Sequence, residues 1–198
     1  MNLADRLTLL RIILAPVFFI VYFLPVLLPV PFAGAAAWMI ALLWVIGVIA
    51  EFTDMFDGMA ARHFNQTSDF GRLFDPFADT FMQITAFFCF VLDTIFPPVL
   101  FLIVLYREFG ILFIRNLMLK KGITMGARIS GKIKTVAYIT AGAIALFYVS
   151  LNRLGAVESF QPIIRIAAVA AFGISVLFSV LSFFDYLFAY RASVKTGE

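Results

Sequence analysis

The sequence is poor in charge and in cysteine. Only 14% of its 198 residues are charged and 63% are hydrophobic, whereas an ordinary soluble domain is about 25% charged and about 45–50% apolar. The single cysteine, Cys89, excludes a disulfide framework and a cysteine metal site, and its apolar surroundings predict a small buried side chain. The composition therefore places the chain in a lipid bilayer rather than in the class of soluble globular proteins.

Six apolar runs are long enough to cross a bilayer, which takes roughly 20 helical residues each. They cover residues 9–28, 33–50, 80–96, 98–119, 135–151 and 162–190. No repeat, low-complexity tract or linker separates them, so the sequence predicts an all-α integral membrane protein with one domain over residues 1–198. Residues 1–11 mix charges with leucines at helical spacing, which predicts a short interfacial amphipathic helix before the first span.

The positive residues between these runs predict an orientation. Arginines and lysines gather in residues 6–11, 62–72, 115–134 and 191–195, which fall on one side of a protein with six spans, against Arg153 and Arg165 on the other. Positive segments of this kind face the cytoplasm. Both termini are therefore expected there, together with the polar segments 51–79 and 115–134, and any active site is expected to form between these two segments.

Four aspartates in the segment 51–79 are spaced so that they can face one another. Asp54 and Asp57 are three residues apart and Asp75 and Asp79 are four apart, so each pair shares a face if its segment is helical. Helix capping explains a single aspartate well, but four like charges at a membrane boundary are costly unless they bind something. Carboxylates alone suit Mg²⁺ or Mn²⁺, and two such ions can clamp a diphosphate.

Read from residue 54 to residue 79, the pattern DxxDGxxARx₈GxxxDxxxD resembles the complete signature of the CDP-alcohol phosphatidyltransferase family. The resemblance implies four metal ligands, of which Asp79 is also the general base; these are Asp54, Asp57, Asp75 and Asp79. It implies that the CDP moiety lies against Gly58, Ala61, Arg62 and Gly71, where the glycines allow close approach and the arginine can contact a phosphate. The donor implied is CDP-diacylglycerol, within the inner (cytoplasmic) membrane of a bacterium.

Positive residues in segment 107–135 bear on the acceptor alcohol. Arg107 lies within an apolar run and needs an anionic partner, and Glu108, its neighbour in sequence, is expected to point elsewhere on the helix. The acceptor phosphate is predicted to bind Arg107, Arg115, Lys132 and Lys134, since a phosphate monoester carries about two negative charges. Their pattern resembles the phosphatidylglycerophosphate synthase branch, whose acceptor is sn-glycerol 3-phosphate. Residues 2–16 and 182–187 are also similar to that branch.

Other functions remain open at this point. Inositol phosphate would also suit a basic pocket, and serine would need less of one. Membrane prenyltransferases use aspartates and Mg²⁺ with diphosphates, but lack this spacing of glycine, alanine and arginine. A divalent-cation transporter would place its acidic residues nearer the bilayer midplane. Membrane lipids are expected partners and nucleic acid is not, and small-residue groups at 33–37 and 141–143 are compatible with a homodimer.

Overall fold

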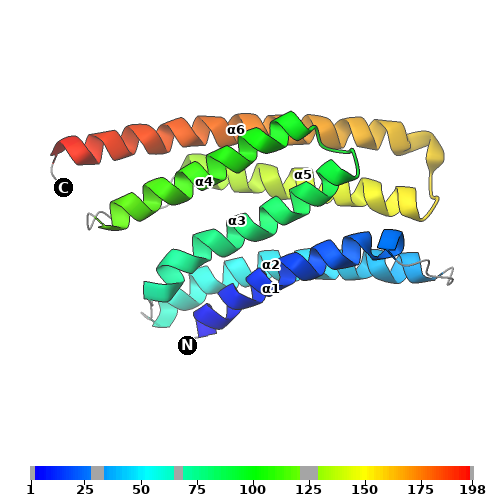
Figure 1. The fold of residues 1–198 in the computed structure, drawn as a ribbon, viewed down its shortest axis with the longest axis horizontal. Helices are drawn as coiled ribbons and strands as arrows, with labels where there is room; N and C mark the ends of the chain where they lie inside the picture. The colour runs from blue at the N-terminus through cyan, green and yellow to red at the C-terminus, as the bar shows by residue number, and fades with distance from the viewer. Residues whose placement is uncertain (1–2, 28–33, 65–68, 121–128, 197–198) are drawn as a thin grey trace. The chain divides into compact units, whose positions relative to one another are not determined.

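The computed structural model describes residues 3–27, 34–64, 69–120 and 129–196, without the side chains of residues 3–4, 26–27, 54–64, 69–73 and 192–196. These residues form only helices and turns (Figure 1). The elements are α1 (Leu3–Leu27), α2 (Ala35–Phe64), α3 (Asp69–Leu92), α4 (Pro98–Lys120), α5 (Ile129–Arg153), the short 3-10 helix η1 (Glu158–Phe160) and α6 (Gln161–Thr196). The prediction of an all-α protein is confirmed.

The helices are longer than the apolar runs that predict them. Within the polar segment 51–79, residues 51–64 belong to the end of α2 and residues 69–79 to the first part of α3. Within the polar segment 115–134, α4 continues to Lys120 and α5 begins at Ile129. A hydrophobic run indicates only the length of helix that lies in the membrane. The backbone stays helical beyond it where polar residues follow without a helix breaker. At about 1.5 Å per residue, α2 is about 45 Å long and extends beyond a hydrocarbon core of about 30 Å.

Four of the helices are long and apolar enough to cross a membrane, judged on the described residues alone. The apolar segments are Asp5–Pro25, Ala35–Thr53, Ile129–Arg153 and Glu158–Arg191. α4 carries four charged residues, Arg107, Glu108, Arg115 and Lys120, and the acidic motif occupies the end of α2 and the start of α3. The chain is thus an integral membrane protein by composition and helix length, with its unusual charge concentrated at the end of α2, the start of α3 and in α4.

The chain divides into two compact units. The first comprises Met1–Cys89 with Val149–Glu158, and the second comprises Phe90–Tyr148 with Ser159–Glu198. The single domain expected over residues 1–198 stays a prediction.

In the first unit, α1 lies alongside α2 (Figure 1). The apolar interior includes Phe18 and Tyr22 from α1 and Leu43 from α2, all buried. Phe19 of α1 stacks on Phe88 of α3, with ring centroids 6.4 Å apart. Cys89 is fully buried, as the sequence predicts. These contacts join α1 to both of its neighbours and fix the face of α1 that meets α3.

In the second unit, α4 lies alongside α6 (Figure 1). The approach is close at Gly110, where a Cβ would lie 3.0 Å from the ring of Phe183, so a larger residue would require this ring to shift. The buried face of α6 contains Ser175, Ser179 and Ser182, at spacings of four and three residues. A stripe of hydroxyl groups therefore lines the interior of this unit.

Candidate active site

The acidic motif is carried by two helices. Asp54 and Asp57 lie in the last part of α2, after the apolar run 33–50 of the sequence, and Asp75 and Asp79 lie in the first half of α3. The helical backbone meets the condition under which each pair shares a face. The side chains of six predicted site residues lie outside the described ones; these are Asp54, Asp57, Gly58, Ala61, Arg62 and Gly71.

Asp75 and Asp79 converge on α1. The Thr8 hydroxyl donates a hydrogen bond to Asp75 Oδ1, and Arg11 Nη1 donates to Asp79 Oδ1. Arg11 Nη2 also lies 3.8 Å from Asp75 Oδ1. Because one guanidinium reaches both carboxylates, the prediction that Asp75 and Asp79 share a face is confirmed.

The start of α1 differs from the expected interfacial helix. α1 runs without interruption from Leu3 to Leu27, and Asp5, Thr8 and Arg11 are buried within the first unit. An interfacial helix turns its polar face to water, whereas the polar face here is turned inward. The positive charge of Arg11 is therefore explained by the aspartates of α3 as well as by topology.

The two described carboxylates fit a hard divalent cation. Their side chains are 39% and 48% exposed, while the Arg11 side chain is 1% exposed. The aspartates are thus open to a hydrated ion from one side and held by a buried cation from the other. Oxygen donors of this kind suit Mg²⁺ or Mn²⁺, which usually keep several waters. Among the described side chains no group of three or more potential metal ligands occurs, and the side chains of Asp54 and Asp57 lie outside them.

The second unit contains a buried charged network centred on Glu108. Arg107 donates from Nη1 to Glu108 Oε1 at 2.9 Å, from Nε to the carbonyl of Ser179 at 3.1 Å, and from Nη2 to Ser182 Oγ at 3.0 Å. The expectation that Glu108 points away from Arg107 is therefore wrong. Successive residues are about 100° apart on a helix, but both side chains are buried on the inner side of α4. Their length lets the charged ends meet where neither can reach water.

Glu108 also binds a second cation. Lys134 of α5 donates from Nζ to Glu108 Oε1 at 3.0 Å, and its ammonium lies 4.7 Å from the ring centroid of Tyr138. The Tyr138 hydroxyl donates to Ser179 Oγ at 2.5 Å. One carboxylate thus neutralises one of two buried cations, and the group formed by Arg107, Glu108 and Lys134 keeps one positive charge.

Arg115 and Lys132 differ from Arg107 and Lys134 in their surroundings. Arg115 lies two turns after Arg107 on α4 and donates from Nη2 to the Tyr186 hydroxyl at 3.1 Å. A Cβ on Gly131 would lie 3.7 Å from the same hydroxyl oxygen, so the first turn of α5 passes next to it. Lys132, the next residue of α5, is exposed. Neither cation makes an ion pair within the described part of the chain.

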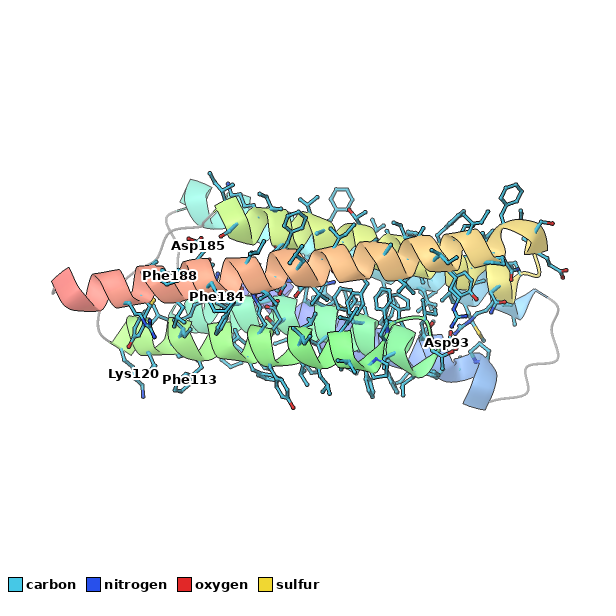
Figure 2. All side chains as sticks on the ribbon, turned by 90° about the horizontal axis from the view of Figure 1, so that it is seen from above. Asp93, Phe113, Lys120, Phe184, Asp185 and Phe188 are labelled. Atoms are coloured by element: carbon cyan, nitrogen blue, oxygen red, sulfur yellow. The ribbon has the colours of Figure 1, made fainter. Side chains whose placement is uncertain are left out.

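α6 supplies a further polar anchor for the start of α5. Ser130 Oγ donates to Asp185 Oδ2 at 2.6 Å. Figure 2 shows Asp185 on the side of α6 that faces α5, while Phe113 and Lys120 extend outward from α4. Lys120 is exposed, as expected of a positive residue that contributes to membrane orientation rather than to a binding site.

Sequence reasoning missed several residues that hold these side chains. They are Thr8, Tyr138, Ser179, Ser182 and Tyr186. One signal was available, because serines at i, i+4 and i+7 in an apolar run indicate a polar stripe on a buried helix face. The pairing of Thr8 with Asp75, 67 residues later, has no counterpart in local spacing.

Comparison with known proteins shows the family of the chain. The family model for CDP-alcohol phosphatidyltransferases matches residues 1–181. A CDP-diacylglycerol–glycerol-3-phosphate 3-phosphatidyltransferase of Treponema pallidum is 35% identical, with 94% of this chain and 88% of that protein covered. Proteins of the same name from Bacillus subtilis and Escherichia coli K12 are 30% and 32% identical, covering 100% and 98% of this chain and 99% and 97% of their own lengths. The chain therefore belongs to the CDP-alcohol phosphatidyltransferase family.

Proposed function

We propose that this protein transfers the phosphatidyl group of CDP-diacylglycerol to sn-glycerol 3-phosphate, releasing CMP. The observation that carries the proposal is the identity of 30–35% to proteins named for this reaction, over at least 94% of the chain. The complete acidic motif and the cations of the second unit supply the two kinds of chemistry that such a transfer requires.

The acidic motif would bind the donor and activate the acceptor. Asp54, Asp57, Asp75 and Asp79 would hold Mg²⁺ or Mn²⁺, as two ions, and Gly58, Ala61, Arg62 and Gly71 would lie against the CDP moiety. When bound, the metal neutralises the phosphoryl oxygens of the diphosphate. Asp79 takes the proton of the acceptor hydroxyl. The hydroxyl oxygen then bonds to the phosphorus that carries diacylglycerol, and the bond from that phosphorus to the CMP oxygen breaks.

The positive side chains of the second unit would bind the acceptor phosphate. Arg107, Arg115, Lys132 and Lys134 carry four positive charges, and Glu108 removes one of them, which leaves three for a phosphate monoester with about two negative charges. Glu108 fixes Arg107 and Lys134 in place, whereas Arg115 keeps donors beyond its bond to Tyr186 and Lys132 is exposed. Arg115 and Lys132 are therefore the cations that contact the phosphate directly.

The membrane arrangement belongs to the same proposal. All six α-helices cross the inner membrane of a bacterium, with the active site and both termini facing the cytoplasm. In the sequence, the apolar run 33–50 ends shortly before Asp54, which supports a site at the membrane boundary rather than at its midplane. A homodimer is compatible with the small residues at 33–37 and 141–143.

The test is an assay of CMP release by the purified protein in detergent with CDP-diacylglycerol. The acceptors compared are sn-glycerol 3-phosphate, inositol phosphate, serine and glycerol, each with Mg²⁺, with Mn²⁺ and with excess EDTA. We expect release with glycerol 3-phosphate and a divalent metal. Preference for inositol phosphate or serine would refute the acceptor, and the absence of CMP release with every acceptor would refute the transferase activity.

A further inference from the structure

Two polar side chains of α1 contact the two described aspartates of the acidic motif. Thr8 bonds Asp75, and Arg11 bonds Asp79 while lying 3.8 Å from Asp75. We propose that Thr8 and Arg11 are positioning residues, which fix the carboxylates of Asp75 and Asp79 in the orientation that binds the divalent metal. This inference rests on the proposed function, because it assigns a role toward the metal of the same site.

The contacts restrict how each carboxylate can turn. An ionised aspartate has two oxygens and about four positions that accept a hydrogen bond or a cation. A hydrogen bond from α1 to Oδ1 restricts rotation about the bond to the carboxyl group. The other acceptor positions of the carboxylate stay available to a metal ion. Ligating carboxylates are commonly hydrogen-bonded in this way by a second layer of residues. Thr8 and Arg11 are three residues apart on α1, and their partners are four apart on α3, so two adjacent turns of one helix serve two adjacent turns of the other.

Packing alone does not account for these side chains. Elsewhere along this face α1 is buried through apolar residues such as Ala15 and Phe18. Placing a guanidinium at 1% exposure costs several kcal/mol of desolvation, which an apolar residue of similar volume would avoid. A buried arginine is favourable next to two converging carboxylates, because it offsets the repulsion between like charges four residues apart on a helix. The shared cation holds Asp75 and Asp79 together before any metal binds.

The inference is tested by the affinity of the purified, metal-free protein for Mn²⁺, measured by electron paramagnetic resonance without donor or acceptor. Thr8→Val keeps the shape of the side chain and its neutral charge but removes the donor, so we expect Mn²⁺ to bind about 10- to 100-fold more weakly. Thr8→Ser keeps the hydroxyl and should bind Mn²⁺ like the parent. In the CMP release assay, Thr8→Val should need correspondingly more Mn²⁺ for half-maximal rate and approach the parent rate at saturating metal.

Arg11→Gln tests the second contact. The direction of its effect on Mn²⁺ affinity distinguishes a positioning role of Arg11 from competition with the metal. Loss of a positive charge next to the metal ligands would by itself strengthen the binding of a cation. Weaker Mn²⁺ binding in Arg11→Gln therefore indicates lost positioning, and tighter binding would show that Arg11 competes with the metal and would overturn its assignment.

Arg153→Gln is the matched control within the same unit. Arg153 also contacts α1, donating from Nη1 to the carbonyl of Tyr22 at 2.8 Å with its guanidinium 4.3 Å from the Tyr22 ring centroid. We expect Arg153→Gln to bind Mn²⁺ like the parent. An equal loss of affinity in Arg153→Gln, or parent-like Mn²⁺ binding by a folded Thr8→Val, would overturn the inference while the transferase activity stands. Failure of the parent itself to bind Mn²⁺ or release CMP would instead refute the proposed function.

Discussion

Glu108 is the counter-charge of two buried cations, and its removal gives a sharp test of the network. The side chain accepts hydrogen bonds from Arg107 at 2.9 Å and from Lys134 at 3.0 Å, and it is 6% exposed. At an effective dielectric constant of about 20, each contact contributes roughly 5–6 kcal/mol of gross attraction, most of which offsets desolvation. Glu108→Gln keeps the size of the side chain but leaves two neighbouring cations without a counter-charge. We expect it to lower the free energy of unfolding by about 3–5 kcal/mol.

Lys134→Met gives the matched comparison. It removes one of the two cations, so the remaining pair of Arg107 and Glu108 is balanced, and the expected loss is about 0–2 kcal/mol. Added to Glu108→Gln, the same substitution removes a repulsion, so the double variant should be more stable than Glu108→Gln alone. Unfolding in detergent micelles with increasing sodium dodecyl sulfate, followed by far-ultraviolet circular dichroism, measures these differences. The reasoning fails if Glu108→Gln unfolds within about 1 kcal/mol of the parent, or if Lys134→Met is the more damaging change.

Three further predictions concern catalysis, each measured as CMP release by protein whose fold is verified by circular dichroism. Asp57→Ala should abolish release, as should EDTA reversibly, because the carboxylates act as a unit; full turnover by the folded variant would contradict this. Asp79→Asn should still bind CDP-diacylglycerol but lose about 10²-fold or more in kcat, and a near-parent rate would exclude Asp79 as the base. Arg115→Ala and Lys132→Ala should each raise the KM for glycerol 3-phosphate about 10- to 150-fold, from roughly 1.5–3 kcal/mol per contact. The donor KM and the control Lys120→Ala should change little, and a change confined to the donor KM would refute the acceptor role.

The all-α class and the approximate positions of α1 to α6 could be predicted from the sequence because each of these helices overlaps an apolar run of about 17 residues or more. The separate interfacial helix expected at residues 1–11 was not found, since α1 is continuous from Leu3. The ends of the helices could not be predicted, since the polar extension of α2 through Asp54 to Phe64 carries no hydrophobic signal. Within the acidic motif, spacing alone was sufficient for the common face of Asp75 and Asp79. Local geometry of this kind is fixed by the helical repeat and needs no knowledge of tertiary contacts.

The contacts that hold the site side chains depend on tertiary structure. A helical wheel separates Arg107 from Glu108, yet burial leaves the two charges no better partner than each other. Likewise, the spacing within α1 shows that Thr8 and Arg11 share a face, but it does not reveal that α3 covers that face. Such pairings depend on which helices become neighbours, and a single sequence gives little information on that.

Within the contacts described above, each group of charged side chains holds more charges of one sign than of the other. In the first unit, one cation, Arg11, contacts the two carboxylates of Asp75 and Asp79. In the second unit, Glu108 faces both Arg107 and Lys134. A surplus charge close to hydrocarbon destabilises the protein until a ligand of opposite sign arrives. In the proposed function, a divalent cation would be such a ligand for the first group and a phosphate for the second, so by linkage each should stabilise the folded protein as it binds. The surplus charge that lowers stability is thus the same charge that would recognise the metal and the acceptor.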